Sequence, residues 1–307
     1  MQSIRKFSGI LVFLMCFNGI VSGQNAGLAF LKIGVDARAM ALGNAVTAAV
    51  TGPSAAYWNP AGLVEGSALK AVFHHNQWLF GSSSEFVGLS SSHGTTAWGV
   101  FVNSFFIDDI EVRDIASTNP LATTNALFLT TGFSYARQVH PHWIVGATGK
   151  YIFQKIYVEQ AGGWALDFGV KYRWRDRLQF GAVLQNVGRM APLQEERTPL
   201  PVTFRWGVQW QPTFIPEAWH AMVTADVVKF RGQPWGASLG GELLWRKTIA
   251  LRGGVLLGYT NRWWSIGIGL LKTRFQFHYA LVPFTTGIGV THQFTLGILL
   301  DGSGNRK

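Results

Sequence analysis

Two short motifs in this 307-residue chain have residue types and spacings that could support chemistry. Residues 236–240 read Gly-Ala-Ser-Leu-Gly, the pattern of a nucleophilic serine at a strand-to-helix turn. Here the motif lies inside a stretch that alternates apolar and polar residues, with no helix expected after it, so we predict no catalytic serine. His140 and His142 could bind a metal, but no third ligand lies nearby, so an ordinary turn is the preferred interpretation.

Four acidic residues stand close together at positions 108, 109, 111 and 114. Carboxylates bind hard cations such as Ca²⁺, but this spacing matches no EF-hand loop, and a solvated loop is the preferred interpretation. No set of residues combines a nucleophile, a base and an oxyanion-stabilising group. The sequence therefore predicts no enzyme, no cofactor and no metal site.

The first 23 residues have the organisation of a secretory signal peptide. Arg5 and Lys6 precede an apolar run over residues 10–21, and cleavage is expected near Gly23. The run is too short to span a bilayer, which argues against the alternative of an uncleaved anchor. The one cysteine, Cys16, lies in this segment, so the mature chain is expected to have no disulfide and no thiol chemistry.

The composition is unusual for a soluble domain. Aromatic residues make up 14% of the chain and charged residues only 14%, against about 25% in typical globular proteins. After the signal peptide no apolar run approaches the roughly 20 residues of a membrane-spanning helix. Backbone groups in lipid must all be paired, so the remaining structure that can span a membrane is a closed β-barrel. The net charge of +10 comes from scattered basic residues, so we expect no nucleic-acid partner.

Long stretches of alternating apolar and polar residues predict the strands of that barrel. In residues 165–174 and 202–211, for example, every second side chain is apolar, which gives each strand one apolar face and one polar face. A soluble β-sandwich or β-propeller is the alternative. A propeller should show a repeat of about 40–50 residues, and none is present. A sandwich would need a second sheet to cover each apolar face. We predict 14 strands: 68–78, 82–92, 95–107, 124–138, 142–157, 162–174, 178–187, 201–211, 218–230, 235–246, 248–259, 263–271, 274–282 and 288–300.

The fold class predicted from this pattern is all-β, a 14-stranded antiparallel outer-membrane barrel that crosses the membrane once with each strand. The two longest connections, 108–123 and 188–200, fall on the same side, as expected of outer loops, and both termini are expected in the periplasm. Tryptophans concentrate near strand ends, which favours two aromatic girdles. Polar residues expected to face the lumen could line a pore or pair with a plug; they are Lys150, Asp167, Lys171, Arg173, Arg205, Glu242, Arg246, Arg252 and His278.

Residues 24–66 do not alternate and are rich in small side chains. They predict either a hatch-like plug folded into the lumen or an ordinary hairpin with a surface turn. Small residues allow close backbone packing, and Asn-Pro favours a turn. The residues expected to form the hatch are Arg38, Gly43, Trp58, Asn59, Pro60, Ala61, Gly62 and Leu63. The predicted division is thus a signal peptide (1–23), a hatch segment (24–66), a barrel (67–300) and a polar tail (301–307).

The stretch from Gly34 to Ala45, with Ala37-Arg38-Ala39 and Leu42-Gly43-Asn44, followed by the Trp-Asn-Pro-Ala-Gly-Leu turn at residues 58–63, resembles the start of the PorV/PorQ family. That family belongs to the wider class of FadL-like outer-membrane barrels. The resemblance is strong over residues 30–63 and elsewhere extends only to the general architecture. Three departures are a chain shorter than typical PorV proteins, Gly43-Asn44 where relatives often have a Gly pair or Gly-Asp, and a terminal strand that does not end on an aromatic residue.

The resemblance implies a role in type IX secretion. The expected function is that of a non-enzymatic outer-membrane component whose outer loops bind other proteins. These would be either secreted cargo, bound by the C-terminal signal domain of the cargo, or partners in the attachment complex. Whether it would be the shuttle or the attachment subunit stays open. The alternative is a FadL-like transporter of hydrophobic small molecules, which predicts an apolar pocket beside the hatch and a gap in the barrel wall.

Overall fold

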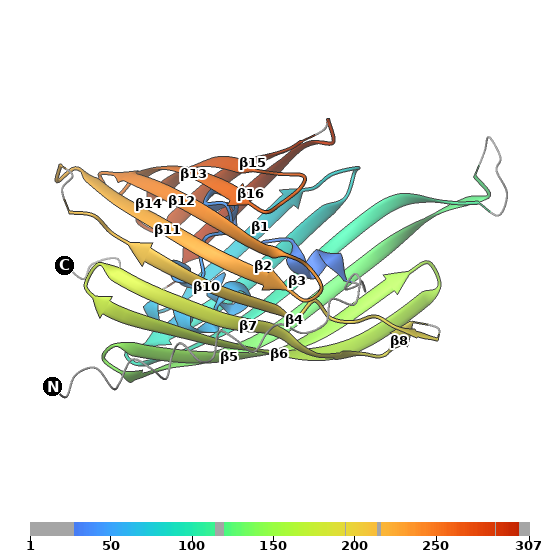
Figure 1. The fold of residues 1–307 in the computed structure, drawn as a ribbon, viewed down its shortest axis with the longest axis horizontal. Coiled ribbons are helices and arrows are strands. Elements are labelled where there is room, and N and C mark those ends of the chain that lie inside the picture. The colour runs from blue at the N-terminus through green and yellow to red at the C-terminus, as the bar shows by residue number, and fades with distance from the viewer. Residues whose placement is uncertain (1–27, 114–119, 194, 214–215, 286, 301–307) are drawn as a thin grey trace.

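The computed structural model describes residues 28–113, 120–193, 195–213, 216–285 and 287–300, so the predicted signal peptide and polar tail lie outside the described residues. Fourteen strands form one closed antiparallel barrel in the order β1-β16-β15-β14-β13-β12-β11-β10-β7-β6-β5-β4-β3-β2 (Figure 1). The barrel strands are β1 (Lys70–Gln77), β2 (Ser83–His93), β3 (Thr96–Val112), β4 (Ala122–His140), β5 (Trp143–Ile156), β6 (Glu159–Arg175), β7 (Leu178–Met190), β10 (Thr203–Trp210), β11 (Trp219–Phe230), β12 (Trp235–Trp245), β13 (Ile249–Leu257), β14 (Trp264–Lys272), β15 (Phe275–Phe284) and β16 (Gly289–Leu299).

The predicted fold class is confirmed, and the alternating pattern explains why. On β6, for example, Trp164, Leu166 and Phe168 are exposed on the outer wall, whereas Ala165 and Asp167 between them are buried in the lumen. A closed ring leaves no unpaired sheet edge, so the backbone is satisfied while the apolar side chains face outward. Among the described residues no helix is both long and apolar enough to cross a membrane.

The outer connections contain longer and additional strands that were not predicted from the sequence. β3 and β4 run on past the barrel as a long hairpin, with a register shift between Ile107 and Ile110, and this hairpin projects to the right in Figure 1. The predicted loop 188–200 contains a short two-stranded sheet, β8 (Pro192–Leu193) paired with β9 (Glu196–Arg197). Neither region alternates regularly between apolar and polar residues, so the pattern used to predict the strands did not extend them this far.

The N-terminal segment, residues 28–66, lies inside the ring of strands (Figure 1). It contains η2 (Ala29–Lys32), α2 (Ala37–Ala41), α3 (Ala55–Trp58) and η3 (Pro60–Glu65). Nearly all of its side chains are buried, and many of them form a core with inward residues of the strands, such as Phe86 and Phe101. The alternative of an outer hairpin with a surface turn is thereby excluded for this segment.

The wall of the barrel is interrupted beside β7. The β7–β10 pairing ends at Gln185 and Thr203, whereas β7 continues to Met190 paired with β6 alone. Pro199 and Pro201 precede β10 and have no backbone N–H, so they cannot extend the ladder. On its other side β7 bulges, because two of its residues stand opposite Asp167. This part of the wall is therefore held by fewer backbone hydrogen bonds than the rest of the sheet.

Candidate functional site

The Asn-Pro turn fixes the centre of the N-terminal segment. The Asn59 side chain accepts a hydrogen bond from Ala61 N (3.2 Å) and donates to the carbonyl oxygens of Thr47 (2.8 Å) and Val170 (3.3 Å). It thus caps η3, and Pro60 occupies a first-turn position where no backbone N–H is needed. One side chain therefore joins two parts of the segment to β6.

The other residues predicted to form the hatch also lie inside this segment. Trp58 is 1% exposed and donates from Nε1 to Val35 O (2.9 Å). Leu63 is fully buried. Gly43 has a left-handed backbone (φ 66°) and lies against β13, and a methyl group on Gly62 would overlap the carbonyl oxygen of Val50. The sequence motif therefore identifies the positions where the segment turns and packs most closely.

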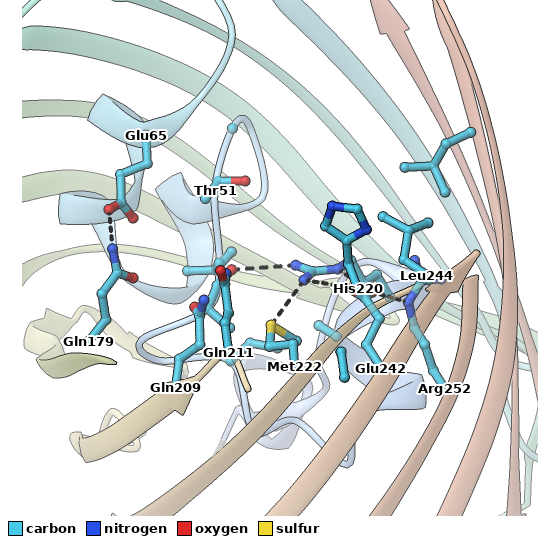
Figure 2. Close-up of a pocket in the computed structure, with 18 of the residues that line it drawn as sticks. Thr51, Glu65, Gln179, Gln209, Gln211, His220, Met222, Glu242, Leu244 and Arg252 are labelled. Atoms are coloured by element: carbon cyan, nitrogen blue, oxygen red, sulfur yellow. Dashed lines mark hydrogen bonds and ion pairs between the residues drawn. The ribbon is translucent and has the colours of Figure 1, made fainter. Parts of the chain in front are cut away.

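Arg38 connects the segment to the wall through a charged network. It contacts both carboxylate oxygens of Glu242, at 2.9 Å and 3.1 Å, and donates to Ala49 O (3.4 Å). Glu242 also accepts from Arg252 Nε (2.5 Å), and Arg252 contacts His278 Nδ1 (3.1 Å). All four residues line one cavity, and Figure 2 shows Glu242 and Arg252 side by side in it. Four predicted residues, one from the hatch set and three from the lumen set, therefore form one network.

A second network holds the end of the segment. Glu65 accepts from Lys171 Nζ (2.6 Å), Arg173 Nε (3.0 Å) and Gln179 Nε2 (2.5 Å), and Lys171 also donates to Val50 O (2.7 Å). Burial alone would raise the pKa of Glu65, but the charges and hydrogen bonds of Lys171 and Arg173 outweigh it and lower that pKa below its ordinary value. Glu65 is therefore ionised in the folded barrel.

This lowered pKa predicts a pH dependence of stability. A carboxyl group whose pKa is lower in the folded than in the unfolded state stabilises the fold above its ordinary pKa, and that contribution is lost as the pH falls through the folded value. At about pH 7 we expect the urea concentration at the midpoint of unfolding to be higher for wild type than for Glu65→Gln. This difference should shrink as the pH is lowered to about 3. A difference that stays constant with pH would show that the charge of Glu65 contributes nothing.

The remaining lumen residues occupy separate positions. Lys150 pairs with Asp167 (2.5 Å) beside the β7 bulge, and the guanidinium of Arg205 lies 4.9 Å from the Trp58 ring centroid. Arg246 differs from the prediction: it lies in the exposed β12–β13 turn, over the ring of Trp245 (5.0 Å). The predicted strand ran one residue too far, and a turn residue does not follow the alternation that assigned Arg246 to the lumen.

Asp226 on β11 belongs to the site, although the sequence analysis did not select it. Its Oδ2 accepts hydrogen bonds from Val46 N (3.1 Å), Thr47 N (3.0 Å) and Thr47 Oγ1 (2.6 Å). It therefore binds a turn of the N-terminal segment much as an N-cap carboxylate binds a helix end. Asp226 could have been predicted to face the lumen from its inward position in an alternating strand, because the other lumen-facing polar residues were predicted in the same way.

Glycines bring the strands within contact distance of the segment. Inward-facing glycines on eight strands lie against it; we call them the glycine belt, and they are Gly99, Gly146, Gly169, Gly181, Gly207, Gly240, Gly254 and Gly267. A methyl group on Gly146 would meet Ala61 N, and one on Gly254 would meet Gly43 N and Leu42 C. Because glycine has no side chain, the backbone of the segment can approach the strands closely at these positions. Glycines at inward positions in the middle of predicted strands could have indicated that another part of the chain packs against the strands there.

A polar cavity of about 860 Å³ lies at the end of the barrel where β1 begins. The first charged network lines it, together with Glu65 and Gln179 of the second. Lys70 also lines it, and Lys70 Nζ donates to Gln276 Oε1 (2.6 Å). Figure 2 shows the labelled side chains that surround it. Because short turns mark this end, it is the periplasmic mouth of the barrel.

Apolar residues fill the opposite half of the lumen. Phe105, Phe128, Ile152, Met190 and Leu200 pack around residues 28–31 of the segment. The ring of Phe30 lies 5.2 Å from that of Phe128. A pocket of about 670 Å³ lies at the wall interruption, and its lining runs from Trp164 on the outer face to Met190 and Leu200 in this apolar cluster. The transporter alternative expects an apolar pocket and a gap in the wall; the wall pocket lies beside this apolar cluster, and Arg189, Thr198 and Arg231 also line it.

The two motifs set aside in the sequence have no catalytic surroundings. Ser238 is a buried inward residue within β12, with no helix after it. His140 and His142 lie at an exposed turn. The described residues hold no group of three or more His, Cys, Asp or Glu side chains placed to bind a metal ion.

No family model and no curated protein sequence matches the chain. Solved structures share its fold. The monoaromatic hydrocarbon channel CymD has a TM-score of 0.61 at 12% identity over 89% of this chain and 97% of that one. The toluene transporter TodX of Pseudomonas putida scores 0.61 at 11% identity over 86% and 97%. A FadL homologue of Pseudomonas aeruginosa scores 0.57 at 12% identity over 86% and 98%.

The chain therefore has the FadL-type 14-stranded fold. This fold and the apolar outer wall place it in a bacterial outer membrane, in contact with lipid. The predicted role in type IX secretion, with its cargo and attachment partners, is wrong, because the similar structures are channels and transporters of hydrophobic molecules. The narrower resemblance to PorV/PorQ finds no support, and the short N-terminal motif that suggested it occurs here in a barrel of the wider class.

Proposed function

We propose that the chain is an outer-membrane transporter that admits hydrophobic small molecules. The observation that carries this proposal is the wall pocket beside β7, which reaches from the outer face to the apolar cluster in the lumen. Supporting it are structural neighbours described as a monoaromatic hydrocarbon channel and a toluene transporter. Such a molecule partitions into lipid and apolar surfaces, so a path through apolar residues costs it little desolvation.

In this proposal residues 28–66 act as the hatch. The segment is hydrogen-bonded to β6, β11, β12 and β14 and fills the lumen between the apolar cluster and the periplasmic cavity. A water-filled pore across the barrel is thereby blocked, whereas the outer apolar half stays connected to the wall pocket. The hatch thus separates a hydrophobic entry side from a polar exit side.

Uptake of a radiolabelled monoaromatic hydrocarbon tests the proposal. We expect cells that produce the protein to accumulate the label faster than cells that lack it, and Ala191→Trp, which adds an indole to the lining of the wall pocket, to abolish most of the difference. Val158→Trp, at an exposed outer turn away from the pocket, is the control and should transport normally. Equal uptake with and without the protein, for both a hydrocarbon and a fatty acid, would refute the transporter function.

A further inference from the structure

Exposed basic side chains surround the periplasmic mouth of the barrel. They lie in the short turns or at the adjoining strand ends; we call them the basic rim, and they are Arg137, Arg175, Arg177, Arg246, Lys247, Lys272 and Arg274. In the described part of the same turns the acidic residues are Asp176 and Glu217. Positive charge therefore dominates this end of the molecule.

The opposite end does not share this excess. Its exposed charges among the described residues are of both signs and are equal in number: the acidic ones are Asp108, Asp109, Glu111 and Glu195, and the basic ones are Arg113, Lys155, Arg189 and Arg231. Among the described residues the excess of exposed positive charge thus lies at one mouth, and the composition alone did not reveal this asymmetry. A distribution this uneven creates a field at the periplasmic end that attracts anions.

Tryptophans fix the depth of the basic rim in the membrane. Exposed indoles follow the outer wall at the same end, including Trp143, Trp174 and Trp245. Trp rings favour the boundary between hydrocarbon and water. Arg175 and Arg246 come directly after two of these tryptophans, and Arg246 remains stacked over Trp245. The basic rim therefore lies where the headgroups of the periplasmic leaflet begin.

We propose that the basic rim binds the headgroups of anionic phospholipids in the periplasmic leaflet. A phosphodiester accepts hydrogen bonds from guanidinium and ammonium groups, and basic residues next to a membrane attract anionic lipids. The rim extends around the mouth from β4 to β15 rather than forming one flat patch. A shell of lipid contacts all of these turns at once, whereas a compact protein partner would cover only one side. The inference depends on the membrane location and not on what the barrel transports.

Lipid enrichment tests this inference. Mature protein is reconstituted into vesicles of nine parts phosphatidylcholine to one part phosphatidylglycerol and extracted in mild detergent, and the retained lipids are quantified by mass spectrometry. We expect phosphatidylglycerol to be enriched several-fold over the bulk ratio, and Arg175→Gln, Lys247→Gln, Lys272→Gln and Arg274→Gln together to lower the enrichment about threefold or more. High salt should lower it as well, because charge attraction is screened.

The matched control removes charge from the outer end. We compare the double variant Lys247→Gln/Lys272→Gln with Lys155→Gln/Arg189→Gln, which changes two exposed basic residues at the opposite end. The first should lose part of the enrichment, and the second should retain it. No enrichment in wild type, or equal losses in both double variants, overturns the inference. So does capture of an acidic protein from outer membranes by wild type without lipid enrichment, which would identify a protein as the partner.

Discussion

Replacing Gly254 with alanine is expected to displace the N-terminal segment, because the new methyl group would overlap the backbone of Leu42 and Gly43. Overpacking a tight site costs typically about 1–3 kcal/mol, and here the obstacle is backbone, which cannot rotate away as a side chain can. We expect a lower urea-unfolding midpoint and, in planar bilayers, ion currents that wild type does not show. Unfolding and conductance report the two consequences separately.

The neighbouring residue provides the control for this experiment. Gly253 faces outward, and a methyl group added there meets no atom within 4 Å, so Gly253→Ala should resemble wild type in both assays. Gly240 and Gly241 form a second pair of the same kind, with Gly240 against Leu42 and Gly241 in open space. If the inward and outward members of each pair behaved alike, the glycine belt would have no role in seating the segment.

Replacing Glu65 with leucine is expected to have the second large effect. The Lys171 side chain is fully buried, and without Glu65 its amine would have only Val50 O to accept a hydrogen bond. Removing one partner of a buried ion pair costs about 3–5 kcal/mol, because an uncompensated charge remains. We expect the free energy of unfolding, measured by urea titration in detergent, to fall by about this amount.

A double variant separates this mechanism from simple loss of packing. Adding Lys171→Met to Glu65→Leu removes the buried charge, so most of the lost stability should return, and the two single effects should be far from additive. Asp176→Asn, in an exposed turn, is the control and should change stability by about 0.5 kcal/mol or less. Additive losses in the double variant would contradict the role assigned to the pair.

The barrel could be predicted from the sequence because its signal is local and repeated. In β6, outward Trp164 and inward Asp167 follow from the alternation of apolar and polar residues alone, and the closed ring follows from the need to pair every backbone group in lipid. The Asn59-Pro60 turn was predictable for the same reason, since the bond from Ala61 N to Asn59 that caps η3 is local. Errors occurred where a turn replaces the alternation, as at Arg246.

The contacts between the segment and the strands could not be predicted in the same way. Whether Asp226 meets Thr47, or Glu242 meets Arg38, depends on how the segment lies in the lumen, and residues far apart in the chain decide that. The wall interruption depends on Pro199 and Pro201 standing beside a bulge on another strand. The functional error had a different cause: a motif of about thirty residues indicated a family, whereas the pocket on which the proposed function rests is built from β6, β7 and the segment before β10.

The enclosure of residues 28–66 constrains how the protein can assemble. The segment is the first part of the described chain, yet the strands that hold it include β6, β11 and β14, which follow much later. The ring is completed only when β1 pairs with β16, the two ends of the barrel sequence. The bonds that hold these early residues can therefore form only after the later strands have been made, so the segment is expected to reach its final place late in assembly.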